Sequence, residues 1–219
     1  MWSASVLRLH LVTDRKICGR NRLAEVVAQA VAGGVDAVHL REPDLGAGEL
    51  YRVAIELKAA IGGRALLVVN DRVDVALAVG ADGVQLGGRS LSVEATRLIA
   101  GGRLLVGRSV HSVEEAAVAT AAGADYLVAG SVFATASHPD QPPAGVELIR
   151  AIHRTVSVPV YGIGGIDRAN AAAVVAAGAQ GVAVIRAILA ATDPLAAAQE
   201  LATVVAAAAR PSTLRGVQV

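Results

Sequence analysis

One stretch of the sequence places a histidine where acid–base chemistry could occur. Residues 105–115 read LVGRSVHSVEE, in which a short apolar run ending at Gly107 predicts a buried strand, and a polar turn and a helical pattern follow. Ser112 and Glu115 have the spacing of a capping box, which predicts a helix that begins at Ser112. His111 is therefore expected between a strand and a helix. Imidazole titrates near neutral pH, so this histidine could move a proton, although a loop histidine that only bonds nearby backbone would look the same.

Other polar side chains also come directly after apolar runs. One of them is Asp14. The others are the candidates for substrate binding, which are His39, Arg41, Asn70, Asp71, Gln85 and Thr135. A partly buried guanidinium such as that of Arg41 needs an anion, and a substrate is a candidate. His39 and Gln85 could contact a substrate or, equally, fill the upper core through hydrogen bonds to their neighbours. Asp71 could instead pair with Arg72 and cap the following helix.

A pair of glycines is the candidate for phosphate binding. Gly164 and Gly165 follow the seventh apolar run, at a helix start that is expected before Arg168, and their exposed backbone amides could bind a phosphate. Ile185 and Arg186 follow the eighth run. The loops after the seventh and eighth strands are the usual phosphate site of an α/β barrel, so these four residues are expected to share one site.

Eight short apolar runs set the expected architecture. The predicted strands cover residues 9–12, 37–40, 66–69, 83–86, 105–107, 126–129, 158–163 and 181–185. Continuous apolar runs are typical of parallel strands buried on both faces. Eight consecutive units in 219 residues favour a single (β/α)8 TIM barrel of the α/β class over an open sheet, with all strand ends at one rim. We expect the barrel domain over 1–209 and a flexible tail over 210–219.

The segments between these runs have helical patterns. Helices are expected at 23–31, 48–61, 73–79, 93–100 and 112–122, with a last one from residue 193. Similar fragments at 34–38, 80–84, 123–127 and 178–182 precede strands and indicate a repeated helix-to-strand corner. We expect no chemistry from these corners.

Composition narrows the class of protein. Hydrophobic residues make up 54% and aromatic residues 2% of the chain, so the core must be mainly Ala, Val, Leu and Ile. A net charge of +1 with interspersed signs predicts no nucleic-acid and no membrane partner. The single cysteine, Cys18, excludes an internal disulfide and, together with the lack of a signal-peptide pattern, predicts a cytoplasmic protein. No histidine, cysteine or carboxylate cluster has metal-ligand spacing, so no metal is expected.

Taken together, the residues at the strand ends resemble those of the thiamine-phosphate synthase superfamily over residues 9–201. The matching pieces are LVTD at 11–14, HLRE at 39–42, VNDR at 69–72, GVQLG at 83–87, the loop 130–135, GIGGI at 162–166 and GVAV at 181–184. The resemblance implies a barrel, a phosphate anchored at Gly164 and Gly165, and a thiamine-precursor substrate.

The superfamily has two enzymatic branches, and departures from their patterns distinguish them. Pro43 stands where the synthases carry a lysine, and residues 88–90 read GRS where the synthases have a second acidic Mg²⁺ ligand. Asp71 matches the first metal ligand, and Arg186 replaces a small hydroxyl residue. The stretch around His111 instead resembles the TenI-type thiazole tautomerases, in which the matching histidine is the proposed acid and base.

The resemblance therefore implies a thiazole tautomerase that needs no cofactor and aromatises a carboxythiazole phosphate by moving a proton from a ring carbon to the exocyclic carbon. His111 would carry the proton, and Arg41 would hold the substrate carboxylate. Two alternatives stay open: a Mg²⁺-dependent thiamine-phosphate synthase that joins hydroxymethylpyrimidine pyrophosphate to thiazole phosphate, and a non-catalytic binder of thiazole or thiamine phosphates. The expected partner is a small phosphorylated thiazole, and a homodimer is open as well.

Overall fold

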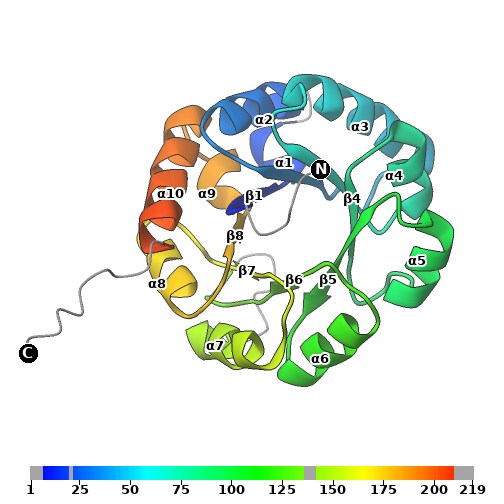
Figure 1. The fold of residues 1–219 in the computed structure, drawn as a ribbon. Coiled ribbons are helices and arrows are strands. Elements are labelled where there is room, and N and C mark those ends of the chain that lie inside the picture. Colours follow the sequence, from blue (N-terminus) through cyan, green and yellow to red (C-terminus); the bar gives the residue numbers. More distant parts are fainter. Residues whose placement is uncertain (1–6, 20–21, 136–141, 210–219) are drawn as a thin grey trace, which may run out of the picture.

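Eight parallel strands close into a barrel. The computed structural model describes residues 7–19, 22–135 and 142–209. Each strand pairs with the next one in the sequence, and β8 pairs with β1, so the sheet has no free edge. The strands are β1 (Leu9–Val12), β2 (Ala37–Leu40), β3 (Leu66–Asn70), β4 (Gly83–Leu86), β5 (Leu105–Val110), β6 (Tyr126–Ala129), β7 (Val160–Ile163) and β8 (Gly181–Val184). The predicted single (β/α)8 barrel is confirmed (Figure 1).

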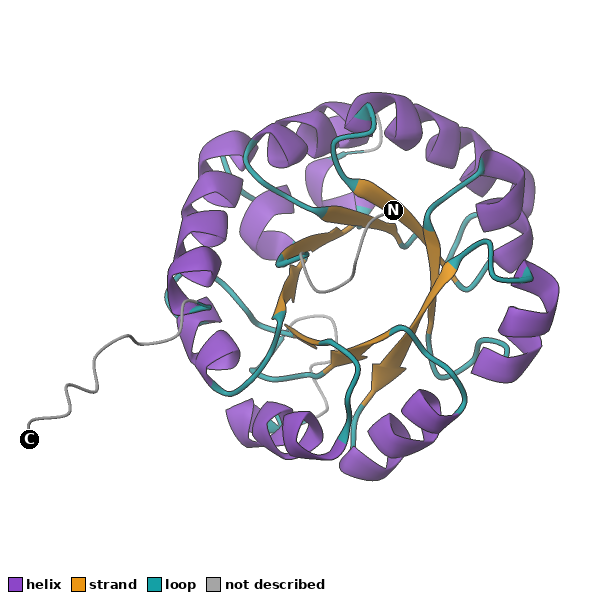
Figure 2. Cartoon of the chain, in the orientation of Figure 1, coloured by secondary structure: helices purple, strands orange, loops and turns teal. Residues whose placement is uncertain are grey.

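Helices form a ring around the strands (Figure 2). The longer ones are α2 (Leu23–Ala32), α3 (Ala47–Ile61), α4 (Val73–Val79), α5 (Val93–Ala100), α6 (Val113–Ala121), α7 (Gly145–Thr155), α8 (Ala171–Ala176) and α10 (Pro194–Ala208). The short helices α1 (Arg15–Cys18) and α9 (Arg186–Leu189), which follow β1 and β8, were not predicted, and neither was α7. The helix start expected before Arg168 was wrong, because α8 begins at Ala171. None of the described helices is long and apolar enough to cross a membrane. The predicted tail over 210–219 lies outside the described residues, and the domain boundary at 209 stays a prediction.

The repeated helix-to-strand corner has a structural role. In three of its four copies, an aspartate just before a strand accepts a hydrogen bond from a backbone N–H of the preceding strand. These bonds join Asp36 to Leu9 (3.0 Å), Asp82 to Leu67 (2.8 Å) and Asp125 to Val106 (2.7 Å). The carboxylates thereby tie neighbouring strands together at the end of the barrel opposite the C-terminal rim.

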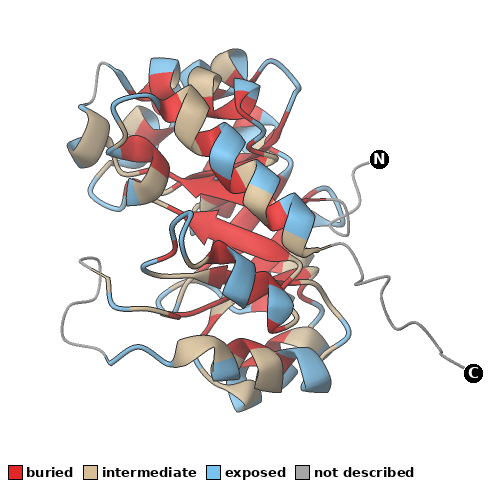
Figure 3. Cartoon of the chain, turned by 90° about the vertical axis from the view of Figure 1, so that its left-hand side faces the viewer, coloured by how far each residue is buried: buried red, intermediate tan, exposed pale blue. Residues whose placement is uncertain are grey.

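Burial follows the layers of the barrel. The strands are buried almost throughout, and the helices expose their outer faces (Figure 3). Aliphatic side chains fill the layer between strands and helices, as the composition predicted. The barrel interior differs, because Tyr126 and Tyr161 fill it together with the buried histidines His10 and His39.

Strand β5 is longer than predicted. It extends past Gly107 to Val110, because residues 107–110 pair with β6 from Tyr126 onward. Ser109 consequently lies in the strand, and its side chain contacts Gln85 inside the barrel. The end of the predicted strand at Gly107 was therefore wrong, although the helix after Ser112 begins as predicted. Strand β7 is shorter than predicted and begins at Val160.

Gly107 provides a test of packing inside the barrel. A Cβ at this position would lie 2.2 Å from Cζ of Tyr126 and 2.3 Å from Oε1 of Gln85. We expect Gly107→Ala to lower the free energy of unfolding by about 1–3 kcal/mol, because overpacking strains a well-packed interior. Gly48 on α3 is the matched control, since a Cβ there would have no atom within 4 Å other than its chain neighbours and the backbone of its own helix. Gly48→Ala should raise stability by up to about 1 kcal/mol. Chemical denaturation measures both, and equal effects would contradict the packing argument.

Candidate active site

A cavity of about 550 Å³ opens at the rim formed by the C-terminal ends of the strands. Every residue predicted for the site lines this cavity. They are His39, Arg41, Asn70, Asp71, Gln85, His111, Thr135, Gly164, Gly165, Ile185 and Arg186. The structure thus brings together residues from seven different strand ends, and their individual roles stay predictions.

His111 is held by two hydrogen bonds, one from its backbone and one from its ring. Its backbone N–H donates to Oε2 of Glu115 (2.7 Å), while Ser112 accepts from the Glu115 N–H (3.1 Å). The capping pair is therefore present, but the carboxylate reaches one residue further back than in a standard capping box. Nδ1 of His111 lies 2.5 Å from the carbonyl oxygen of Gly130. Because a carbonyl only accepts, Nδ1 must carry the hydrogen, and Nε2 of the neutral ring is left as the basic nitrogen.

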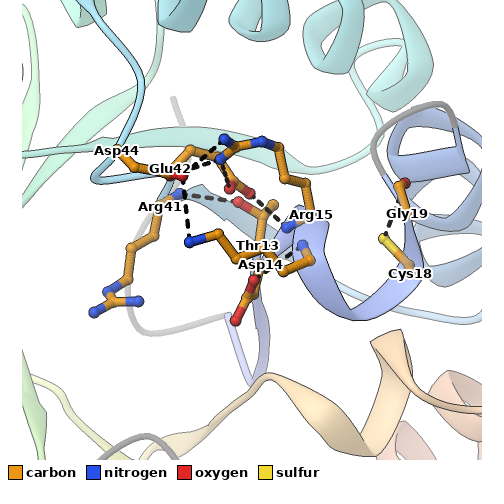
Figure 4. Close-up of polar contacts among 9 residues, drawn as sticks. Thr13, Asp14, Arg15, Cys18, Gly19, Arg41, Glu42 and Asp44 are labelled. Carbon is orange, nitrogen blue, oxygen red and sulfur yellow. Dashed lines mark hydrogen bonds and ion pairs between the residues drawn. The ribbon is translucent and has the colours of Figure 1, made fainter.

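A buried acid beside the cavity has its own cation. Glu42 is 5% exposed, and Arg15 donates to it from the guanidinium (2.8 Å) and from the backbone (3.0 Å). Arg15 also forms a two-bonded pair with Asp44 (2.7 and 2.9 Å), which holds the pKa of that carboxyl well below its usual range. These bonds fasten the segment after β1 to the segment after β2 (Figure 4).

The guanidinium of Arg41 is left without an acidic partner among the described residues as a consequence. Its backbone N–H donates to Oγ1 of Thr13 (3.0 Å), which fixes the residue at the end of β2. Its guanidinium points away from the cluster that Arg15 forms with Glu42 and Asp44, here called the Arg15 cluster (Figure 4). It forms no hydrogen bond or ion pair with any residue that the structure describes. Because Glu42 and Asp44 are already paired with Arg15, an anionic ligand is the partner that suits this guanidinium.

Asp71 does not pair with Arg72. Arg72 instead pairs with Asp74 (2.5 Å), so the alternative that Asp71 only pairs with Arg72 is wrong. Asp71 adopts a positive φ of 63° and accepts hydrogen bonds from the Ser90 hydroxyl and from the Gly87 N–H (3.3 Å). Its carboxylate therefore bridges the ends of β3 and β4 beside the cavity.

The site supplies few metal ligands. Asp71 is the single acidic residue among the described residues that line the cavity, and the described part of the chain holds no cluster of three histidine, cysteine or carboxylate ligands. Mg²⁺ is commonly bound by one or two carboxylates together with substrate phosphates. Asp71 with the Ser90 hydroxyl therefore fits a Mg²⁺ shared with a phosphorylated substrate, and does not fit a closed protein site.

The glycine pair brings two loops into close contact. Gly164 and Gly165 both have positive φ (101° and 60°), which favours glycine. A Cβ on Gly165 would lie 2.3 Å from the carbonyl oxygen of Ala134, and one on Gly164 would lie 2.7 Å from Cβ of Ser131. The segment after β7 can therefore lie against the loop after β6 only if both residues are glycine, and both segments line the cavity.

The cavity floor combines the two roles that the sequence left open. His39 contacts its neighbour His10 through a hydrogen bond (3.1 Å), and Gln85 donates to Ser109 (3.0 Å), yet both side chains also line the cavity. Sequence reasoning missed Ser109, because the strand was ended too early. A strand alternation continued past Gly107 would have placed Ser109 on the inward face.

Arg89 and Ser131 also line the cavity and were not predicted as site residues. Arg89 follows β4 and Ser131 follows β6, which are positions where barrel enzymes carry functional side chains. The closed (β/α)8 barrel thus has a polar cavity at the rim where barrels of this kind carry their active sites. An arginine without a partner among the described residues and a glycine-lined segment after β7 both belong to its lining.

Comparison with known proteins identifies the family. The family model described as thiamine monophosphate synthase matches residues 9–188. A thiamine-phosphate synthase of Roseiflexus sp. (strain RS-1) is 44% identical over 202 residues, which cover 91% of this chain and 86% of that protein. A thiamine-phosphate synthase of Methanoregula boonei is 45% identical over 197 residues, which cover 89% and 91%. The solved thiamine phosphate pyrophosphorylase from Pyrococcus furiosus has a TM-score of 0.85 and 41% identity, covering 92% of this chain and 96% of that one.

The chain therefore belongs to the thiamine monophosphate synthase family. The resemblance to this superfamily is confirmed. The similar proteins carry the name of the synthase, which was the alternative to the expected tautomerase, so the comparisons favour that alternative.

The contribution of the Arg15 cluster to the stability of the fold can be tested. We expect Arg15→Leu to lower the free energy of unfolding by about 2–3 kcal/mol, because it leaves the buried Glu42 carboxylate without its charged donor. Lys16→Ala is the matched control, since Lys16 contacts Asp44 at 3.3 Å with a side chain that is 72% exposed. Exposed pairs contribute little, so the control should change stability by less than about 0.5 kcal/mol. Urea denaturation of both variants gives the comparison, and a loss no larger for Arg15→Leu than for Lys16→Ala would overturn it.

Proposed function

We propose that the protein is a thiamine-phosphate synthase, which joins hydroxymethylpyrimidine pyrophosphate to a thiazole phosphate. The observation that carries the proposal is the 44–45% identity to proteins of that name over about nine-tenths of both chains. In this reaction the thiazole ring nitrogen bonds to the methylene carbon of the pyrimidine. The carbon–oxygen bond to pyrophosphate breaks, and pyrophosphate leaves with the electron pair.

The cavity supports this reaction by its size and its charges. Its volume of about 550 Å³ lies within the range of small-molecule sites and leaves room for two substrates side by side. Gly164 and Gly165 would hold the thiazole phosphate through backbone amides, with Ile185 and Arg186 beside them. Arg41 would bind the anionic pyrophosphate and orient it, because its guanidinium has no partner in the described part of the chain.

Asp71 and Ser90 would hold a Mg²⁺ that is shared with the pyrophosphate. When bound, the ion would neutralise charge on the leaving group. The hydrogen bond from Ser90 supports this role, since it fixes the orientation of the carboxylate. Pro43 and Arg89 remain departures from the synthase pattern, and the experiment therefore examines the metal requirement directly.

The first test is a coupling assay with and without Mg²⁺. The purified protein should form thiamine phosphate from the two substrates only when Mg²⁺ is present. We expect Asp71→Asn to lower kcat/KM at least about tenfold. Asp74→Asn is the matched control, because Asp74 pairs with Arg72 and does not line the cavity. Coupling that persists without Mg²⁺, or an Asp71→Asn enzyme as active as the control, would contradict this site assignment.

A second candidate is the thiazole tautomerase, which the geometry of His111 favours. With Nδ1 bonded to the Gly130 carbonyl, Nε2 is the nitrogen that can remove a ring proton and return it. In that case Arg41 would hold the carboxylate of the substrate, while the glycine pair would hold its phosphate. No metal is needed for this proton transfer.

The tautomerase candidate predicts a large effect of a single substitution. His111→Ala should lower kcat for aromatisation of the carboxythiazole phosphate at least about a hundredfold. Binding of thiazole phosphate, followed as a rise in melting temperature, should survive. His153→Asn on α7 is the matched control, because His153 does not line the cavity. Wild-type turnover in His111→Ala would remove His111 from the mechanism, and ligand-induced stabilisation without activity in either assay would favour the non-catalytic binder.

A further inference from the structure

Four polar rings fill the barrel interior beneath the cavity. His10 packs against Tyr161 with ring centroids 4.0 Å apart and against His39 at 5.0 Å, and Tyr126 meets all three rings edge-on. His39 pairs in register with Val12, two residues nearer the rim than His10. Accordingly His39 lines the cavity, whereas His10 lies behind it.

One hydrogen bond joins the rings of the two histidines. Nε2 of His39 lies 3.1 Å from Nδ1 of His10, and each residue is 1% exposed. Burial lowers the pKa of His39 to about 4, and burial together with the neighbouring His39 lowers the pKa of His10 well below its ordinary value. Both rings are therefore neutral at pH 7. A bond between two neutral imidazoles needs one nitrogen that carries a hydrogen and one that does not.

The surroundings of His10 decide which nitrogen donates. Nε2 of His10 is buried and has no partner among the described residues. A hydrogen on that nitrogen would leave an orphaned N–H in the interior, which proteins avoid more strictly than an unfilled acceptor. His10 is better satisfied with its hydrogen on Nδ1, donated to His39. His39 then accepts at Nε2, and its own hydrogen must be on Nδ1.

We propose that His10 is a positioning residue that acts through His39 and holds His39 as a neutral Nδ1–H donor on the cavity floor. Such a donor would bind an acceptor atom on the uncharged ring of a substrate, away from the phosphate and pyrophosphate groups. Gln85 supports a ligand at this level, because it is 3% exposed, lines the cavity, and its Oε1 has no partner among the described residues. That the substrate carries such an uncharged ring rests on the proposed function. The tautomer inferred for His39 does not depend on the proposed function.

Imidazole spectra test the tautomer directly. Long-range ¹H–¹⁵N spectra of the full-length protein with ¹⁵N-labelled histidine report which nitrogen of each ring carries hydrogen. At pH 7 we expect both His10 and His39 as neutral Nδ1–H tautomers, assigned by the signals that disappear in His10→Asn and His39→Gln. A neutral His39 with its hydrogen on Nε2, or a charged ring at pH 7, would overturn the proposal.

Ligand affinity tests the positioning role, with thiamine phosphate as the probe. His10→Leu should weaken binding about tenfold, since it frees the orientation and tautomer of His39 and loses roughly one hydrogen bond. His10→Asn should recover most of this loss, because its amide can donate from near the position of Nδ1. Tyr161→Phe is the matched control, since it keeps the ring against His10 and removes the hydroxyl that donates to the Leu7 carbonyl.

The outcomes separate the two proposals. Wild-type affinity in His10→Leu, or an Asn variant no better than the Leu variant, would show that His10 has no positioning role. Should the wild-type protein fail to bind thiamine phosphate, the proposed function would fall. The imidazole spectra would still decide whether His10 holds His39 as the donor.

Discussion

All eight strands of this barrel run parallel and therefore end at the same rim. Since β8 hydrogen-bonds to β1, the sheet closes and the strands are buried almost throughout. The aspartates of the helix-to-strand corners fasten the opposite end, where Asp82 and Asp125 bond the backbone of neighbouring strands. Backbone pairing therefore fixes the strand ends relative to one another. Side chains such as Arg41, Asp71 and His111 are brought to one cavity by this closure alone, although they lie far apart in the sequence.

Ion pairs around the rim decide which charges remain for a ligand. Arg15 neutralises Glu42 and Asp44, so that the guanidinium of Arg41 is left without an acidic partner among the described residues. On the next strand, Arg72 pairs with Asp74 and leaves Asp71 beside the cavity. A charged group without a partner in a partly buried site is unfavourable until a ligand binds. The arrangement therefore favours anionic substrates, as expected of a family that acts on phosphorylated compounds.

Two histidines of the site differ in what their surroundings allow. His111 is exposed, and the Gly130 carbonyl fixes its Nδ1–H, so Nε2 can exchange protons with a ligand. His39 is buried, and the desolvation that lowers its pKa keeps it neutral. The ring of His111 is thus suited to proton transfer. The ring of His39 is suited to a hydrogen bond in which its donor and acceptor nitrogens do not change. The same residue type serves different chemistry because the dielectric surroundings differ.

The sequence by itself determined the barrel, most strand ends and eleven residues that line the cavity, because apolar runs, glycine positions and caps such as Ser112 are local signals. It missed Ser109, Arg89 and Ser131, which line the same cavity. It could not determine the length of β5, which depends on pairing with β6. It also could not determine which acid pairs with Arg72, since Asp71 precedes that arginine directly and Asp74 follows it two residues later. The hydrogen bond between His10 and His39 could not be predicted from the sequence either, because the two residues meet only when β1 and β2 pair. Contacts between neighbouring strands depend on register and on side-chain packing, and only the tertiary structure sets these.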